Sequence, residues 1–238
     1  MIAFSEDGFL GRQLTLRQPV AGFRAGLDAV MLAAAVPARA GETALELGAG
    51  VGTASLCLAH RTGCAVRGIE IDPELVALAQ WNAQRNAMAD RVVFEAGDAL
   101  ALRGAVFDHV FCNPPFHDER GRSSPDVGRA RALHDGGSLK DWVKSGLEQV
   151  APHGSLTIIL RADRVGEVVE VLPERGGIVF PLLPRAGALP KRVIVQWRGG
   201  RDAALWTQAG LVLHLADGKY TDEADSILRG TSGLCINS

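Results

Sequence analysis

The sequence predicts an α/β fold, in which helices alternate with the strands of a central sheet. Short apolar runs at residues 43–47, 66–72 and 91–96 are typical of buried strands. Helical patterns at 53–60 and 74–88 separate these runs, and a glycine-rich turn joins the first strand to the first helix. Alternation of this kind is typical of a sheet that is covered by helices.

The turn after the first predicted strand has glycine at alternate positions, Gly48, Gly50 and Gly52. Glycine tolerates a positive φ angle and lets a ligand approach the main chain closely. No Lys follows the turn, as a phosphate-binding P-loop requires, and the dinucleotide fingerprint G-x-G-x-x-G does not fit cleanly. The pattern that fits is an acidic residue, Glu46, two places before G-x-G-x-G. A tight turn without a ligand is the alternative.

Carboxylates end the second predicted strand and follow the third. Glu70 lies at about the twenty-residue offset that is expected of an acid that binds ribose hydroxyls. Asp72 and Pro73 are typical of a helix start, with Asp as the N-cap and Pro at the first helical position. Asp98, after the third strand, can accept a hydrogen bond from an exocyclic amine such as that of adenine. An Asp that only caps its own turn explains this position nearly as well.

A rigid corner follows the next strand pattern, at Asn113, Pro114, Pro115 and Phe116. The prolines restrict the backbone, and a corner with an Asn amide and an aromatic ring can hold a flat, planar nitrogen group. Asn-Pro is also a common turn signal, so a simple turn is the alternative. The position of the corner behind a strand and the other motifs favours a functional site.

Together these segments resemble the class I S-adenosylmethionine-dependent methyltransferases. The matching residues are 46–52, 68–72, 97–99 and 113–116, in the order that the family has them. The resemblance implies a Rossmann-like, seven-stranded sheet of order 3-2-1-4-5-7-6 with strand 7 antiparallel. It implies S-adenosyl-L-methionine as cofactor, S-adenosyl-L-homocysteine as product, and no metal. The implied cofactor site consists of Glu46, Gly48, Ala49, Gly50, Gly52, Glu70, Ile71, Asp98, Ala99 and Asn113.

The resemblance also implies that the corner binds a nitrogen acceptor. Family members with this corner methylate adenine N6, cytosine N4, guanine N2 or a glutamine side chain, all nitrogens whose lone pair is delocalised. The carbonyl oxygens of Asn113 and Pro114 can accept the two hydrogens of such an amine, so that positioning and charge stabilisation carry the catalysis. Pro115 completes the predicted catalytic corner, and Phe116 is expected to stack on the target ring.

Residues 1–40 are expected to form an N-terminal extension that packs on the cofactor site of a methyltransferase domain at 41–238, within a single structural domain. The pattern predicts a short strand at 14–19 and an apolar helix at 27–36. Residues 22–30 resemble the lead-in of bacterial methyltransferases that modify adenine N6 in a valine tRNA. That resemblance implies that Arg24 and Asp28 lie near the methionine end of the cofactor. A helix N-cap and a solvated charge are equally good interpretations of these two residues.

A polar segment at 117–137 follows the corner and is rich in Gly, Ser, Pro and Arg. Because long loops in compact domains are often functional, we interpret it as a substrate lid in which His117, Arg120 and Arg122 contact the substrate. A solvated insertion is the alternative. Lys191 and Arg192 extend the predicted substrate patch. They adjoin a predicted antiparallel hairpin, 177–183 and 192–197, which is expected at the edge of the sheet next to a fifth strand at 155–160.

Composition agrees with a single soluble enzyme. A formal net charge of −2 and a pI near 6.3 give no general nucleic-acid signature, so any RNA contact must come from a local patch. No apolar run is long enough to span a bilayer, and residues 1–11 lack the basic start of a signal peptide. The four cysteines show no paired metal spacing, so we expect a cytoplasmic protein with reduced, mostly buried thiols. The oligomeric state has no signature in the sequence.

We predict that the chain methylates adenine N6 in a tRNA. One alternative is a guanine-N2 rRNA methyltransferase, since His117 after Phe116 is typical of those enzymes. Others are a protein glutamine N5-methyltransferase and a non-catalytic cofactor-binding partner subunit. The guanine enzymes usually have a duplicated N-terminal domain and the glutamine enzymes an N-terminal helical bundle, and neither fits the short segment before Gly48. An intact corner argues against the non-catalytic subunit.

Overall fold

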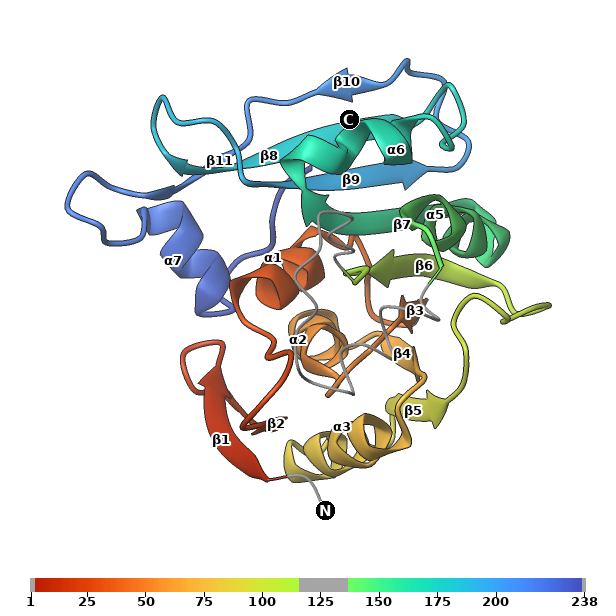
Figure 1. Cartoon of the computed structure of the whole chain (residues 1–238), viewed down its shortest axis with the longest axis vertical. Coiled ribbons are helices and arrows are strands. Elements are labelled where there is room, and N and C mark those ends of the chain that lie inside the picture. The colour runs from red at the N-terminus through yellow and green to blue at the C-terminus, as the bar shows by residue number, and fades with distance from the viewer. Residues whose placement is uncertain (1–2, 116–136, 237–238) are drawn as a thin grey trace.

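A single large sheet runs through the computed structural model, which describes residues 3–115 and 137–236 (Figure 1). Its nine strands follow the order β10-β8-β9-β7-β6-β3-β4-β5, with β11 also paired to β8. Their bounds are β3 Thr43–Leu47, β4 Ala65–Glu70, β5 Val92–Ala96, β6 Phe107–Cys112, β7 Val150–Arg161, β8 Gly177–Arg185, β9 Arg192–Arg198, β10 Trp206–Thr207 and β11 Leu211–His214.

The predicted strand order is confirmed. The series β5-β4-β3-β6-β7-β9-β8 is the order 3-2-1-4-5-7-6, and β9 runs antiparallel to both β7 and β8. One expectation was wrong, because the β8–β9 hairpin is not the edge of the sheet. β10 and β11 pair in parallel with the outer side of β8. These two strands have only two and four residues, too few for a clear period in the sequence.

Helices cover both faces of the sheet and enclose two hydrophobic clusters. Neighbouring residues of β6 point to opposite faces, so Phe111 lies in one cluster while Val110 and Cys112 lie in the other. The first cluster takes residues from α1 (Leu27–Ala35), α2 (Thr53–Thr62), α3 (Pro73–Arg85) and α7 (Asp222–Leu228), and the second from α5 (Leu139–Glu148) and α6 (Val165–Val169). Among the described residues, no helix is both long and apolar enough to cross a membrane.

The parallel strands bring the predicted motifs to one edge. β3, β4, β5, β6 and β7 all run in the same direction, so their carboxyl ends face the same side of the sheet. The glycine turn follows β3, Glu70 ends β4, and Asn113 follows β6. The crevice outside the carboxyl ends of such strands is where open α/β sheets bind ligands.

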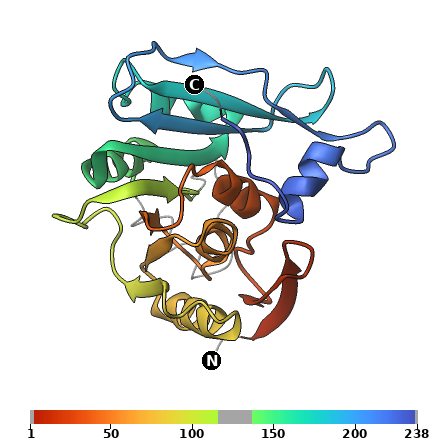
Figure 2. The same ribbon diagram turned by 180° about the vertical axis from the view of Figure 1, so that it is seen from behind.

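A separate hairpin, β1 (Phe4–Phe9) and β2 (Leu14–Pro19), lies beside α3 (Figure 1, Figure 2). Asn82, which is fully buried, accepts a hydrogen bond from Arg17 N at 2.7 Å and donates to Arg17 O at 3.1 Å. Asn86, one helical turn later, binds the N–H and the carbonyl of Thr15 in the same way, both at 3.0 Å. Asn82 in α3 and Asn86 at its C-cap thus take the place of a neighbouring strand for β2, and Asn82 also donates to Val51 O in the glycine turn at 2.9 Å.

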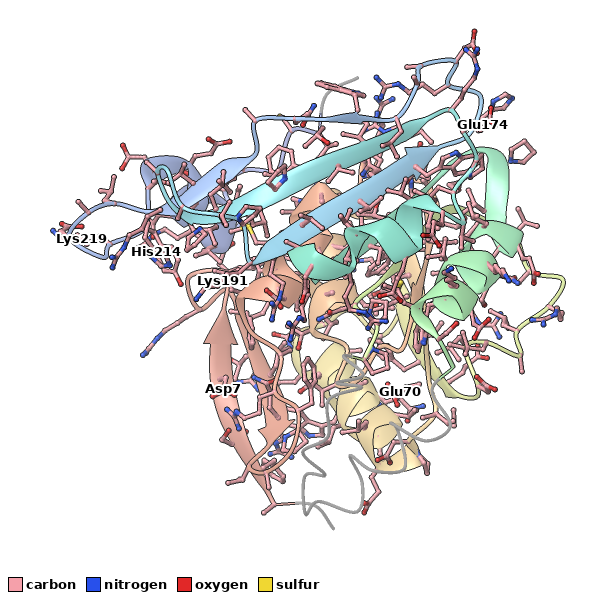
Figure 3. The ribbon with its side chains drawn as sticks, turned by 45° about the horizontal axis from the view of Figure 1, so that its top comes forward. Asp7, Glu70, Glu174, Lys191, His214 and Lys219 are labelled. Atoms are coloured by element: carbon pink, nitrogen blue, oxygen red, sulfur yellow. The ribbon has the colours of Figure 1, made fainter. Side chains whose placement is uncertain are left out.

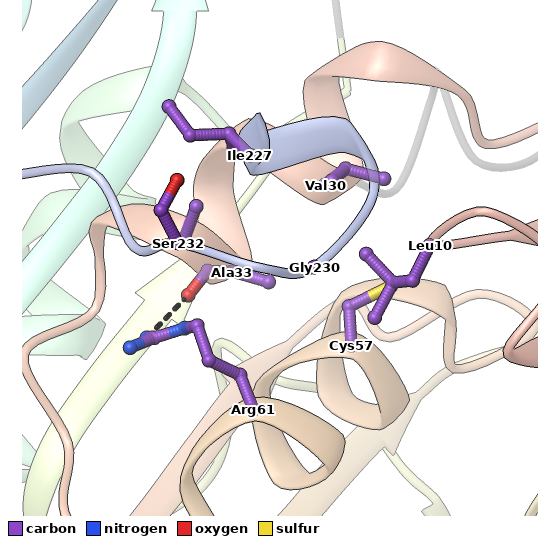
Figure 4. Close-up of a pocket in the computed structure, with 9 residues that line it drawn as sticks. Leu10, Val30, Ala33, Cys57, Arg61, Ile227, Gly230 and Ser232 are labelled. Atoms are coloured by element: carbon purple, nitrogen blue, oxygen red, sulfur yellow. Dashed lines mark hydrogen bonds between the residues drawn. The ribbon is translucent and has the colours of Figure 1, made fainter. Parts of the chain in front are cut away.

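A small cavity of about 10 Å³ lies where α1, α2 and α7 meet (Figure 4). Leu10, Val30 and Ile227 line it, and the guanidinium of Arg61 donates to Ala33 O at 2.9 Å at its border. A space of this size holds about one water molecule at most. We therefore assign it to helix packing.

The four cysteines are all free thiols. Cys57, which lines the small cavity, Cys64 and Cys112 are buried, and Cys235 is exposed.

Candidate cofactor and acceptor site

A cavity of about 260 Å³ opens at the carboxyl edge of the sheet. Its volume is near the lower end of the range for small-molecule sites, roughly 300–1,000 Å³. It brings together most of the residues that the sequence predicts for the cofactor and the corner, from four different connections. They are Glu46, Gly48, Ala49, Gly50, Glu70, Ile71, Asp98, Ala99, Asn113, Pro114 and Pro115.

The glycine turn needs glycine for steric reasons. Gly48 has a φ of 70°, and a Cβ atom there would come within 2.8 Å of the ring of Trp142. Gly52 has a φ of 82°, and its Cβ atom would lie 2.4 Å from the ring of Phe94. Gly52 does not line the cavity, and its role is to let the turn take a positive φ angle and pack against Phe94. The turn therefore presents bare backbone to the cavity. A side chain at Gly48 would clash with Trp142, which also lines the cavity.

Glu70 connects the glycine turn to the end of β4. Its Oε2 accepts a hydrogen bond from Gly50 N at 2.8 Å, and its Oε1 accepts one from Asp72 N at 3.0 Å. Asp72 caps α3 by accepting from Glu74 N at 2.8 Å, as the sequence predicts. The carboxylate of Glu70 is thus fixed in position before any ligand binds, with its remaining lone pairs available at the cavity wall.

Glu46 is a buried acid beneath the same turn, with only 4% of its surface exposed. Its Oε2 accepts from Ser55 N at 3.0 Å and from Ser55 Oγ at 2.5 Å. Burial raises the pKa of Glu46 to about 8, because the desolvation of the carboxylate outweighs the two hydrogen bonds. Near neutral pH the carboxyl group of Glu46 is therefore protonated in the ligand-free protein.

Protonation of Glu46 links pH to stability. Because its folded pKa of about 8 lies above the ordinary 4.5, the folded state keeps a proton between these values that the unfolded state has lost. The contribution of Glu46 to the free energy of unfolding should therefore be fully present below pH 4.5 and be lost as pH rises through 8, by at most about 1.4 kcal/mol per pH unit. We expect Glu46→Gln to remove this contribution in the cofactor-free protein, measured by urea denaturation at several pH values.

The exposed Glu95 provides the control for this measurement. Its carboxylate pairs with Arg67 at 2.6 Å and is half exposed, so Glu95→Gln should leave the pH profile of the wild type unchanged. If Glu46→Gln and the wild type lose stability equally between pH 5 and 8, the proton on Glu46 plays no part in folding stability.

Asp98 fits both interpretations that the sequence allows. Its Oδ1 accepts from Leu100 N at 2.8 Å, which is the cap of a turn. The residue also lines the cavity, where its other oxygen has lone pairs for a donor. Capping the turn and binding a ligand are therefore compatible at this position.

Asn113 presents an acceptor without a donor. Its side-chain oxygen Oδ1 is buried and has no hydrogen-bond partner among the described residues. Leaving a buried carbonyl oxygen unpaired costs about 1–3 kcal/mol, so such an atom is expected to meet a donor when the site is filled. The neighbouring Pro114 and Pro115 line the same cavity. The corner therefore offers an acceptor where a ligand amine can lie.

Arg24 and Asp28 do not line the cavity. Arg24 is held on the N-terminal hairpin, where its guanidinium donates to Asp7 Oδ2 at 2.5 Å and to Pro19 O at 2.7 Å. Asp28 accepts from Arg192 Nε at 2.9 Å. The N-cap of α1 is Gly26, so the N-cap interpretation of Asp28 is wrong. Lys191 and Arg192 lie at the start of β9, outside the cavity lining.

Four predicted site residues, Phe116, His117, Arg120 and Arg122, lie outside the described residues. In the described ranges, no group of three or more His, Cys, Asp or Glu side chains could hold a metal ion. Burial raises the pKa of the Cys57 and Cys112 thiols, which makes both poor nucleophiles.

The structure adds lining residues that the motifs do not predict. Phe23 lies at the cavity with 60% of its surface exposed, and Ala25 and Ala29 line it from the same segment. Leu75 and Trp142 contribute further apolar surface. Phe23 lies within the segment at 22–30 that the resemblance covers. A single aromatic residue in a sequence does not indicate whether it lines the rim of a cavity or packs in the core.

Comparison with known proteins agrees with this geometry. The chain matches the methyltransferase small domain family over residues 25–162. A protein of Shewanella amazonensis named tRNA1(Val) (adenine(37)-N6)-methyltransferase is 38% identical, over 87% of this chain and 91% of its own length. A protein of Porphyromonas gingivalis with the same name is 31% identical, over 91% of each chain.

Solved structures show the same fold. A predicted O-methyltransferase from Agrobacterium tumefaciens superposes with a TM-score of 0.74 at 23% identity, over 89% of this chain and all of its own. The Thermus thermophilus 16S rRNA N2 G1207 methyltransferase gives a TM-score of 0.56 at 20% identity, over 83% of this chain and 50% of its own.

Proposed function

The chain belongs to the methyltransferase small domain family, and from that premise we propose that it transfers the methyl group of S-adenosyl-L-methionine to N6 of an adenine in a tRNA. The observation that carries the proposal is the buried, unpaired Oδ1 of Asn113, a residue that lines the same cavity as the glycine turn and Glu70. Curated relatives that match nearly the whole chain and carry the adenine-N6 name support this acceptor over guanine N2 or glutamine.

The residues of the cavity fit the cofactor. Gly48 has no Cβ atom, and a Cβ atom there would clash with Trp142, so the backbone of the turn stays open to a ligand. Glu70 offers lone pairs for ribose hydroxyls. Asp98 can accept from the adenine amine of the cofactor, and the exposed apolar side chain of Ile71 lines the same cavity. Glu46 lies beneath the turn, and the positive charge of the methionyl portion would favour its ionised form, so that its carboxylate can offset that charge.

The corner acts on the lone pair of the acceptor nitrogen. In adenine this lone pair is delocalised into the ring, which makes N6 a weak nucleophile. Asn113 Oδ1 and the carbonyl oxygen of Pro114 would accept its two hydrogens, so that the lone pair localises and points away from them. When bound, S-adenosyl-L-methionine would supply an electrophilic methyl carbon and its sulfur would be the leaving group, and the extra proton on the nitrogen would pass to solvent. Positioning and carbonyl dipoles then do the catalytic work.

The N-terminal segment would complete this site. We regard residues 1–40 as an extension of a methyltransferase domain at 41–238, supported by Phe23, Ala25 and Ala29 at the cavity and by the hold of Asn82 on β2. A cytoplasmic location fits a tRNA substrate and the free, mostly buried thiols.

Methylation of RNA from cells that lack this gene tests the function. The protein is incubated with isotopically labelled S-adenosyl-L-methionine and total RNA or total protein, and digests are analysed by mass spectrometry. We expect labelled N6-methyladenosine in the tRNA fraction only. Label in N2-methylguanosine of rRNA, or in N5-methylglutamine of a protein, would replace the adenine assignment by one of the alternatives. No label in any fraction would favour a non-catalytic role.

A further inference from the structure

Two aromatic rings are stacked at the end of β11. The ring centroids of His214 and Tyr220 lie 4.6 Å apart with an interplanar angle of 27°, and 39% of Tyr220 is exposed. The two residues form an antiparallel bridge across the turn that follows β11. An exposed, stacked pair of this kind offers a flat face to another ring.

The turn holds this pair rigidly. Leu215 N donates to Lys219 O at 2.8 Å, and Thr221 N donates to Leu213 O at 3.0 Å, which closes the turn on both sides of the bridge. His214 Nδ1 lies 3.2 Å from Gly218 O; since a carbonyl oxygen only accepts, Nδ1 carries the hydrogen and the ring orientation is set. A partner that stacks here would therefore lose little free energy to the ordering of the side chains.

Strand pairing places the pair on the same edge as the cavity. His214 lies opposite Arg185, the last residue of β8, in a parallel pair. β8 is parallel to β7 through the antiparallel β9, and β7 is parallel to β6, which ends beside Asn113. Four strand spacings separate β6 from β11, which is roughly 19 Å. Figure 3 shows Lys191, His214 and Lys219 on the same side of the molecule.

Cations lie on one side of the pair. The side chains of Arg185 and Lys191 have no ion pair or hydrogen bond with any described residue, while Arg192 pairs with Asp28 and Lys219 with Asp217. Asp222 and Glu223 follow Tyr220 in the first turn of α7 and would repel phosphate there. A polyanion is therefore favoured along Arg185 and Lys191, between the pair and the cavity.

We propose that His214 and Tyr220 form a stacking platform for an unpaired base of the RNA substrate, with Arg185 and Lys191 on its flanking phosphates. Proteins recognise RNA loops by stacking splayed bases on aromatic side chains and tracking the backbone with cations. The platform would position a loop whose adenine enters the cavity. The inference rests on the proposed function for the identity of the RNA as a tRNA, but RNA binding itself can be measured without methylation.

Tyr220→Ala tests the platform. We expect binding of a tRNA transcript, measured by fluorescence anisotropy, to weaken at least about tenfold, because each base stacked on an aromatic side chain contributes strongly to affinity. The KM for tRNA should rise by a similar factor, with kcat and the affinity for S-adenosyl-L-methionine unchanged. Tyr220→Phe keeps the ring and should bind as the wild type does. Replacing both Arg185 and Lys191 by Ser should reduce the slope of log K against log salt by about 1.4.

Trp206→Ala is the matched control. Trp206 is 41% exposed and pairs with Ile178, at the opposite end of β8 from His214, so its loss should not change RNA binding. Equal RNA affinity in Tyr220→Ala and the wild type, or an equal loss in Trp206→Ala, would overturn the platform. So would a wild type that binds no RNA. Platform-dependent RNA binding without N6-methyladenosine would instead retain the platform and reject the proposed reaction.

Discussion

Replacement of Asn113 by Ala is expected to lower kcat for methyl transfer by about 10³-fold, near the upper end of the effect of removing one electrostatic contact from a transition state. The buried Oδ1 has no partner among the described residues, so it is free for the acceptor amine. It would interact most strongly when the amine hydrogens gain positive charge in the transition state. The affinity for S-adenosyl-L-methionine should change by less than about threefold, because Glu70, Asp98 and the glycine turn would hold the cofactor.

Single-turnover kinetics with tRNA and calorimetric titration with the cofactor separate these two effects. Asn113→Asp is the matched variant, since it keeps a side-chain oxygen in the same place and should retain more activity than Asn113→Ala. A wild-type rate in Asn113→Ala would mean that the corner does not orient the acceptor. A loss of cofactor affinity equal to the loss of rate would instead make Asn113 a cofactor-binding residue alone.

Glu70→Ala should weaken binding of S-adenosyl-L-methionine by about 100-fold, equivalent to about 2.8 kcal/mol at 1.4 kcal/mol per factor of ten. The substitution removes the acceptor of Gly50 N and Asp72 N, so the glycine turn loses its link to β4. It also removes the carboxylate that would accept from the ribose hydroxyls. Hydrogen bonds to charged groups contribute about 1.5–3 kcal/mol each, which accounts for the size of the effect.

Isothermal titration calorimetry measures this loss, and thermal unfolding of the same samples checks that the variant folds. Glu95→Ala on the neighbouring β5 is the control, because its half-exposed carboxylate pairs only with Arg67 among the described residues and should affect cofactor affinity less than twofold. If Glu70→Ala binds the cofactor as tightly as Glu95→Ala does, Glu70 has a structural role alone.

The motifs predict the fold and much of the cavity because their information is local. Glycine at positions 48 and 52 reflects positive φ angles within one turn, and Asp72 with Pro73 caps the helix that follows at once. Parallel strands then carry the end of each motif to a common edge. The strand order follows from the family resemblance and not from the strand patterns, which do not tell one partner strand from another.

The sequence did not predict which side chains of the N-terminal segment line the cavity. Arg24 and Asp28 stand in a segment that does line the cavity, yet their side chains turn to Asp7 and to Arg192. Phe23 and Ala25, on either side of Arg24, line the cavity instead. Which side chain of residues 23–25 faces the cavity depends on the backbone between β2 and α1, where neither helical nor strand periodicity applies, whereas Asp28 lies in the first turn of α1.

The sequence by itself determined the alternation of the central strands and helices along the chain, the glycine turn, the acids at the strand ends and the Asn113 corner, since each depends on residues within a few positions of one another. Tertiary structure alone decided the pairing of Asp28 with Arg192, 164 residues apart, and the meeting of His214 with Arg185 across β8 and β11. It also left Asn113 Oδ1 buried without a partner in the described structure. Side-chain partners across the chain depend on packing and strand register, and residue patterns encode only which face a residue takes.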